Sequence, residues 1–197
     1  MKTDIVCLGD SIVYGYGASS GGGWPERVAR RLGKRIVNSG ENGDTTAQML
    51  GRFKWDVIRH QPEEVVIMGG SNDILMGVPM DRIKETMTFL VRSAFDARIR
   101  PIVAIPIPVD GKMLKRCWYS SQPVETVEAA LGAYHEWLLA FVGEHGVAAV
   151  DFYQEYPRRM AKVTAGSWYM DGLHPTREGY RILADIFCDA YLKRADK

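Results

Sequence analysis

Residues 5–11 read IVCLGDS, four apolar residues followed at once by a polar turn that contains glycine. The same order recurs at residues 64–73, EVVIMGGSND. Neither apolar run alternates with polar residues, which is typical of a strand that is buried on both faces of a sheet. Such strands belong to parallel sheets that carry helices on both faces. The two segments therefore predict an α/β fold.

Three further apolar runs and five helical patterns extend this alternation along the chain. The predicted strands are Ile5–Leu8, Arg35–Asn38, Glu64–Met68, Ile102–Ile105 and Val147–Val150. The predicted helices begin near Trp24, at Thr45 or Thr46, at a cap formed by Asp81, and near Pro123 and Thr176. Parallel strands need right-handed crossovers, so the alternation predicts a doubly wound sheet. The pattern itself leaves the strand order open.

The helical patterns also predict which side chains face the core. The third helix repeats Ile83, Met87, Leu90, Val91, Ala94 and Phe95 at helical spacing, and all six are predicted to be buried. The last two helices are expected to run from about Pro123 to Glu144 and from about Thr176 to Lys193. These apolar stripes are interpreted as core packing rather than as binding surfaces.

Composition limits the functions that the chain can have. It has 197 residues, 46% of them hydrophobic and 25% charged, so we expect residues 1–197 to form a single domain. The formal net charge is +1, which does not indicate a nucleic-acid partner. Cys7, Cys117 and Cys188 form no CxxC pair. Cys7 and Cys188 lie in apolar patterns and are predicted to be core thiols, as in a reducing cytosol.

The first apolar run, residues 5–8, is too short for the core of a signal peptide. No apolar stretch reaches the length that spans a membrane. The sequence therefore predicts a cytoplasmic protein without stable membrane insertion. It leaves open whether the protein forms a homo-oligomer.

Polar turns follow three successive strands and precede the last helix. They are Gly9–Ser11, Ser39–Thr45, Gly69–Asp73 and Asp171–Pro175. Ligands of open α/β sheets bind beyond the carboxyl ends of the strands, where these turns are expected to meet. Each turn alone is equally consistent with a cap or a loop. Together they supply a hydroxyl, a base, a carboxylate and amide donors, which indicates a nucleophilic acyl-transfer site.

Motifs of other chemistries are absent. The chain has no GxSxG elbow, no GxxxxGK[ST] phosphate loop and no HExxH zinc motif. The histidines at 60, 135, 145 and 174 are not spaced like metal ligands. We therefore expect no metal and no cofactor.

The four turns resemble the sequence blocks of the SGNH hydrolases, also called the GDSL family. Gly9-Asp10-Ser11 matches the nucleophile block, and the segment 38–45 matches the second block, with Gly43 as the aligned glycine. Gly70–Asp73 matches the block that carries asparagine, Asn72, and Asp171–Pro175 matches the block that carries aspartate and histidine. The blocks fall in family order and span residues 9–175. Ile12 departs from the leucine of the family name.

This resemblance implies the fold and the roles of the site residues. It implies a flavodoxin-like three-layer α/β/α sandwich with a five-stranded parallel sheet in the order 2-1-3-4-5. It implies that Ser11 is the nucleophile, His174 the base and Asp171 its orienting carboxylate. The oxyanion hole would consist of the Ser11 and Gly43 backbone N–H groups and the Asn72 side chain. The chain is most similar to the compact bacterial thioesterase and lysophospholipase branch.

The expected substrate is a small-molecule acyl ester or thioester with a short acyl chain. The predicted substrate contacts adjoin the catalytic turns: Asp10, Tyr14, Ile74, Trp118 and Met170. The segment Pro106–Gln122 combines turn residues with apolar side chains, and we expect it to line the acyl pocket or to act as a lid.

Three alternatives remain at this stage. A carbohydrate O-acetylesterase would use the same site. A catalytically silent flavodoxin-like binding module would keep the fold without the chemistry. A nucleotide-binding protein would use the glycine-rich stretch Gly15–Gly23, but the phosphate-binding motifs are missing.

Overall fold

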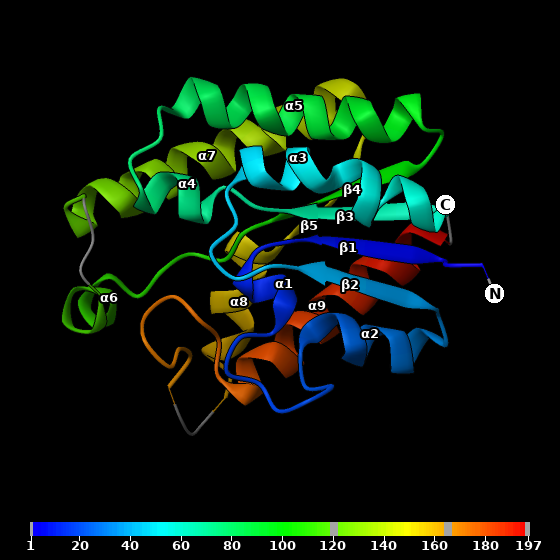
Figure 1. The fold of residues 1–197 in the computed structure, drawn as a ribbon. Helices are drawn as coiled ribbons and strands as arrows, with labels where there is room; N and C mark the ends of the chain where they lie inside the picture. The colour runs from blue at the N-terminus through cyan, green and yellow to red at the C-terminus, as the bar shows by residue number, and fades with distance from the viewer. Residues whose placement is uncertain (1, 119–121, 164–166, 196–197) are drawn as a thin grey trace.

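A parallel sheet of five strands forms the centre of the protein (Figure 1). The computed structural model describes residues 2–118, 122–163 and 167–195. In chain order the strands are β1 (Ile5–Gly9), β2 (Ile36–Gly40), β3 (Glu64–Met68), β4 (Arg100–Ile105) and β5 (Ala148–Asp151). They lie in the order β2-β1-β3-β4-β5 and every pair is parallel. The predicted α/β fold and strand order are confirmed.

Helices cover both faces of the sheet, as Figure 1 shows. One face carries α2 (Trp24–Leu32), α8 (Phe152–Met160) and α9 (Arg177–Ala195). The other carries α3 (Thr46–Asp56), α5 (Met80–Asp96) and α7 (Val124–His145). The shorter elements are α1 (Ser11–Tyr14), the 3-10 helix η1 (Ile58–His60), α4 (Ser71–Leu75) and α6 (Gly111–Cys117).

Alternate residues of β1, β3 and β4 enter two separate hydrophobic cores. In β3, Val66 and Met68 pack into the core beneath α2, α8 and α9, whereas Val65 and Ile67 pack into the core beneath α3, α5 and α7. Burying one such side chain contributes roughly 1.5–3 kcal/mol. Both faces of the strand must therefore be apolar, which explains why the strand patterns do not alternate.

The predicted elements differ from the observed ones in a few places. All five predicted strands are present, with ends that differ by at most two residues. Asp81 does not cap α5, because Pro79 is the residue before the helix and Asp81 lies in the first turn. Phe95 is half exposed, since it lies one residue past the buried Ala94 and is rotated off the apolar face. The buried positions of Cys7 and Cys188 are confirmed.

The strand ends lead directly into the turns that hold the polar residues. The Asp10 carboxylate accepts a hydrogen bond from the N–H of Ile12 and caps α1 behind β1. Thr45 and Gln48 form a capping box at the start of α3, behind β2. Gly70 has a φ of 110°, a conformation that favours glycine, and α4 begins one residue later. Three chain segments are thus turned back toward one edge of the sheet.

No helix within the described residues is both long enough and apolar enough to cross a membrane.

Candidate active site

The side chains of Ser11, His174 and Asp171 form a continuous hydrogen-bonded chain. Ser11 Oγ lies 2.9 Å from His174 Nε2, and His174 Nδ1 lies 2.7 Å from Asp171 Oδ2. Ser11 is 5% exposed and His174 is 3% exposed. A carboxylate accepts the proton of Nδ1, so the Nε2 lone pair faces the serine hydroxyl. A nucleophilic hydroxyl, its base and an orienting carboxylate need this arrangement.

The loop before α9 holds Asp171 and His174 in this geometry. Asp171 Oδ1 accepts hydrogen bonds from the backbone N–H groups of Leu173 at 3.0 Å and His174 at 2.8 Å. Burial raises the pKa of Asp171, but the hydrogen bonds from the backbone and ring of His174 outweigh burial and hold this pKa below its usual value. The carboxylate therefore stays ionised next to the imidazole.

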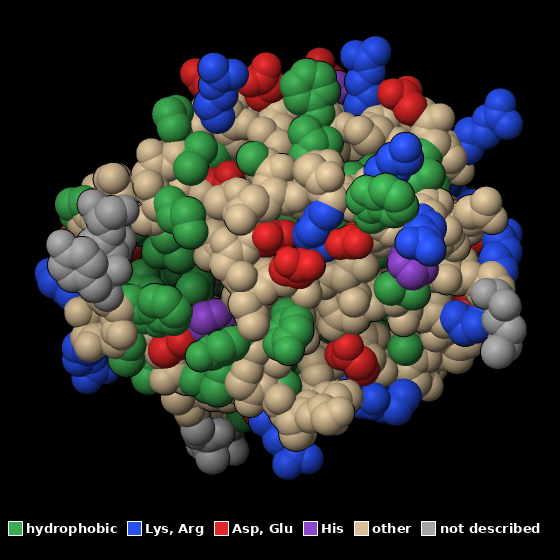
Figure 2. Space-filling view, viewed as in Figure 1, with side chains coloured by type: hydrophobic (Ala, Val, Ile, Leu, Met, Phe, Trp, Pro, Cys, Tyr) green, Lys and Arg blue, Asp and Glu red, His purple; other side chains and the backbone are tan. Residues whose placement is uncertain are grey.

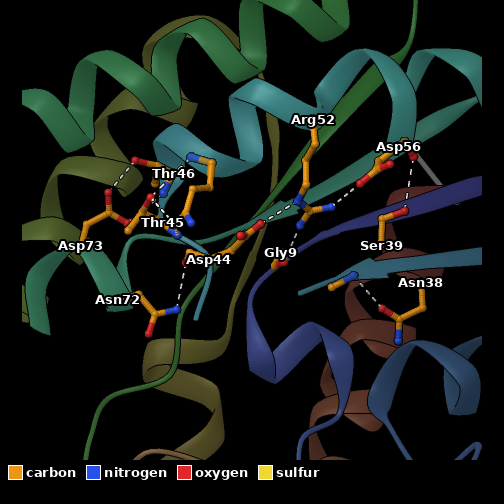
Figure 3. Close-up of polar contacts among 12 residues, drawn as sticks. Gly9, Asn38, Ser39, Asp44, Thr45, Thr46, Arg52, Asp56, Asn72 and Asp73 are labelled. Atoms are coloured by element: carbon orange, nitrogen blue, oxygen red, sulfur yellow. Dashed lines mark hydrogen bonds and ion pairs between the residues drawn. The ribbon is translucent and has the colours of Figure 1, made fainter. Parts of the chain in front are cut away.

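Three candidate oxyanion donors belong to residues that line one pocket: Ser11, Gly43 and Asn72. Ser11 is the first residue of α1, where helix geometry leaves the N–H without a partner inside the helix. Asn72 Nδ2 donates one hydrogen bond to the carbonyl oxygen of Asp44 at 2.8 Å (Figure 3), and its second hydrogen is not needed for that contact. Gly43 has a φ of 83°, and a Cβ there would meet no atom within 4 Å. The space beside Gly43 is therefore open. Gly40, by contrast, packs against α1, because a Cβ there would overlap the backbone of Tyr14.

A pocket of about 430 Å³ opens above these groups. It is lined by Ser11, Tyr16, Asn42, Gly43, Asn72, Leu75, Met76, Trp118, Leu173 and His174. The centroids of the Tyr16 and Trp118 rings lie 4.4 Å and 5.7 Å from that of the His174 ring. Figure 2 shows hydrophobic side chains gathered on this part of the surface. The site therefore combines a polar floor with largely apolar walls, as is usual for a small-molecule pocket.

The structure brings one of the five predicted substrate contacts to the pocket wall, Trp118. Asp10 is buried below α1, and Tyr14 is exposed outside the pocket. Ile74 turns into the core and lines a separate cavity of about 190 Å³. Met170 is half exposed and packs against Gly17. These four side chains do not line the pocket.

The segment predicted to line the pocket contains the helix α6. The N–H of Asp110 donates to the carbonyl of Gly172 at 2.9 Å, and a Cβ on Gly172 would overlap the backbone of Leu114. The segment thus packs against the catalytic loop and reaches the pocket through Trp118. Residues 119–121 of this segment lie outside the described residues, and its role as a lid stays a prediction.

Sequence reasoning missed Arg52, which lies beside the site on α3. Its guanidinium contacts Asp44, Asp56 and the carbonyl of Gly9 (Figure 3). On a helix, Arg52 and Asp56 four residues later are an ordinary surface ion pair. The one available signal was that Asp44, next to the aligned glycine, lies close to this helix in the sequence.

Asp10 is a buried carboxyl group directly next to the nucleophile. It is 1% exposed. Burial, reinforced by the carboxylates of Asp73 and Asp44 and opposed by the hydrogen bond from Ile12, raises its pKa to about 7. In an unfolded chain an aspartate has a pKa of about 3.9. At a pH between these two pKa values, Asp10 keeps its proton in the folded protein and releases it in the unfolded chain.

Asp10→Asn should therefore stabilise the protein more as the pH rises. The wild type loses about 1.4 kcal/mol of unfolding free energy per pH unit from this group between pH 4 and pH 7. Asparagine does not titrate and can still accept the Ile12 N–H. The Tm difference between variant and wild type should grow from pH 4 to pH 7 and then stay level. Asp96→Asn, at an exposed ion pair, is the control. A difference that is constant with pH would contradict the raised pKa.

Within the parts of the chain that the structure describes, no group of three or more His, Cys, Asp or Glu side chains could hold a metal ion. The chemistry that this arrangement supports uses the side chains themselves: a hydroxyl paired with an imidazole, next to fixed amide donors, suits attack on an acyl carbon.

Known proteins are similar to this chain over most of its length. The GDSL-like Lipase/Acylhydrolase family matches residues 7–182. Thioesterase 1/protease 1/lysophospholipase L1 of Escherichia coli is 25% identical over 92% of this chain and 79% of its own length. An acetylxylan esterase of Geobacillus stearothermophilus is 26% identical over 82% of this chain and 74% of its own.

The fold also matches a solved structure. A lipolytic protein of the G-D-S-L family from Desulfitobacterium hafniense superposes with a TM-score of 0.79 at 22% identity. The match covers 96% of this chain and 99% of that protein.

Proposed function

Because the chain belongs to the GDSL-like lipase/acylhydrolase family, we propose that Ser11, His174 and Asp171 hydrolyse a carboxylic ester or thioester through an acyl-enzyme intermediate. The observation that carries the proposal is the 2.9 Å contact between Ser11 Oγ and His174 Nε2 on the floor of an open pocket. The names of the relatives support a carboxylic-ester hydrolase as the class of enzyme.

The proposed reaction has two halves that use the same imidazole. Ser11 Oγ attacks the acyl carbon while its proton passes to His174 Nε2. The imidazolium then gives this proton to the leaving oxygen or sulfur, and the acyl group stays on Ser11. A water molecule then attacks the acyl carbon and gives a proton to His174 Nε2. The imidazolium returns this proton to Ser11 Oγ as the acyl–Oγ bond breaks and the carboxylic acid leaves. Asp171 stays ionised and stabilises the imidazolium in both halves.

Negative charge develops on the substrate carbonyl oxygen in each half. The backbone N–H groups of Ser11 and Gly43 and the side-chain amide of Asn72 are proposed to receive it. Each lies on the lining of the same pocket. Donors that are fixed before the reaction cost no reorganisation, and the loss of one typically lowers kcat by about 10²–10³-fold.

The walls of the pocket favour an apolar acyl chain. Leu75, Met76, Trp118 and Leu173 line it, and its volume is about 430 Å³. None of the described residues that line the pocket is a lysine or an arginine, which favours an uncharged acyl group. We propose a short, uncharged acyl group on an ester or a thioester. A carbohydrate acetyl ester is the second candidate, because one relative is an acetylxylan esterase.

A series of p-nitrophenyl esters from acetate to dodecanoate tests this proposal. A buried methylene contributes about 0.8 kcal/mol, so kcat/KM should rise by up to roughly fourfold per methylene while the chain fits, and then fall. Trp118→Ala should flatten the series, whereas Trp55→Ala, an exposed tryptophan outside the pocket, should not. A sharp preference for acetate would favour the acetylesterase. Absence of any turnover would contradict the proposed function.

A further inference from the structure

The guanidinium of Arg52 joins two of the turns that build the site. Arg52 Nη2 donates to the carbonyl oxygen of Gly9 at 2.9 Å, at the end of β1. Arg52 Nε donates to Asp44 Oδ2 at 2.6 Å, in the turn before α3. Arg52 Nη1 donates to Asp56 Oδ2, also at 2.6 Å, on its own helix. The planar guanidinium has donors in a fixed fork, so three simultaneous bonds restrict its position strongly.

The partners of Arg52 adjoin all three candidate oxyanion donors. Gly9 lies two residues before Ser11 and Asp44 directly follows Gly43. The backbone carbonyl of the same Asp44 accepts the hydrogen bond from Asn72 Nδ2 at 2.8 Å, which orients the asparagine amide (Figure 3). A shift of Asp44 would therefore move the Gly43 N–H and release the Asn72 side chain together.

Helix α3, which carries Arg52, is itself anchored to the third turn. Asp73 accepts hydrogen bonds from the Thr46 backbone N–H at 2.9 Å and from Thr46 Oγ1 at 2.8 Å. Asp73 follows Asn72 in α4. The start of α3 is thus fixed relative to Asn72, and Arg52 extends from this fixed base to β1.

Removing the Arg52 charge would destabilise the turn before α3, which contains Asp44. The Arg52 side chain is 15% exposed and that of Asp44 is 7% exposed. Burial lowers the pKa of Arg52, but hydrogen bonds to Asp56 and Asp44 outweigh it, and the guanidinium stays charged. Without it, the buried Asp44 carboxylate would lose this ion pair and would face the acidic groups of Asp10 and Asp73. A buried, unpaired charge forces the surrounding chain to rearrange.

We propose that Arg52 is a positioning residue that holds the Ser11, Gly43 and Asn72 donors of the oxyanion hole in register. It does not line the pocket, so it acts through Gly9 and Asp44 rather than on the substrate. This inference rests on the proposed function, since it assigns the three donors to an oxyanion. It predicts an effect on the transition state and little effect on substrate binding.

The test compares Arg52→Met and Arg52→Lys with Arg92→Met. Arg92 also pairs with an aspartate four residues later, Asp96, but on the exposed surface of α5. Misplacing reacting groups by about 1 Å costs roughly 10²-fold in rate. Arg52→Met should lower kcat for p-nitrophenyl butyrate by about that factor, with KM within about twofold of wild type. Lysine keeps the charge but cannot bridge three partners. The kcat of Arg52→Lys should therefore lie between those of the wild type and Arg52→Met.

A boronic acid that forms a tetrahedral adduct on Ser11 separates positioning from a loss of folded protein. Its affinity should fall in parallel with kcat in the Arg52 variants, because it places an oxygen in the oxyanion hole. Rates are expressed per active site, titrated with a fluorophosphonate, so that unfolded molecules do not count. If Arg52→Met does not fold, Arg52→Lys carries the test, and we expect at least a fivefold to tenfold loss of kcat, part of the effect of a misplaced site.

Two outcomes would overturn the inference and can be told apart. Arg52 variants with the kcat and boronate affinity of Arg92→Met would contradict the positioning role alone. A wild type that neither hydrolyses the ester nor reacts with the fluorophosphonate would contradict the proposed function, and this inference with it.

Discussion

Ser11→Ala should lower kcat for p-nitrophenyl ester hydrolysis by roughly 10⁶-fold, the effect typical of a missing nucleophile in a serine hydrolase. No other hydroxyl is bonded to His174 Nε2 in the described structure, so the acyl-enzyme cannot form. The substitution removes one oxygen atom and its hydrogen bond. It should change the free energy of unfolding by only about 1 kcal/mol.

Mass spectrometry with a fluorophosphonate checks the same assignment. The probe should add its mass to Ser11 of the wild type and to no residue of Ser11→Ala. Ser20→Ala, which removes an exposed serine away from the pocket, should label and hydrolyse like the wild type. Substantial activity in a folded Ser11→Ala protein would show that another group attacks the acyl carbon.

The meeting of Ser11 with His174 could be predicted, although 163 residues separate them. Strand ends of a parallel sheet meet at one edge, and the turns after residues 8 and 68 both carry glycine and polar residues. Asp171 lies three residues before His174, a spacing at which one short loop can hold both groups. Fold rules therefore predict that the turns meet, and the family resemblance implies which side chains pair there.

Apart from Trp118, the walls of the site could not be predicted, because they depend on two short helices. Helices α1 and α4 begin at Ser11 and Ser71, where the sequence pattern predicts turns. Each helical residue rotates the side chain by about 100°. This rotation turns Ile74 into the core and leaves Leu75 and Met76 at the pocket. Tyr14 is the last residue of α1 and does not line the pocket, whereas Tyr16, past the left-handed Gly15, contacts the His174 ring.

Buried polar contacts between distant segments could not be predicted from the sequence either. Asp10 was predicted to contact substrate, but capping of α1 turns its carboxylate inward. The bond from Arg52 to Gly9 joins residues that are 43 positions apart. Periodicity and turn signals describe local structure, so they carry no information on which backbone carbonyl a helix will approach.

Asp171→Asn should lower kcat by roughly 10⁴-fold while leaving the fold intact. The asparagine Oδ1 can still accept the backbone N–H groups of Leu173 and His174, so the loop should keep its shape. Its NH₂ group would then face His174 Nδ1 and donate to it. The ring must respond by placing its own proton on Nε2, which points at Ser11 Oγ. A protonated Nε2 cannot accept the serine proton, so attack on the acyl carbon loses its base.

A second histidine–aspartate pair in the same chain supplies the control. His135 Nε2 lies 3.0 Å from Asp151 Oδ2, and Asp151 also caps a helix through the N–H of Gln154. Asp151→Asn makes the same chemical change at a pair that does not line the pocket, and it should leave kcat unchanged. Equal losses in both variants would mean that asparagine acts through stability. A folded Asp171→Asn protein with wild-type kcat would show that Asp171 does not set the tautomer of His174.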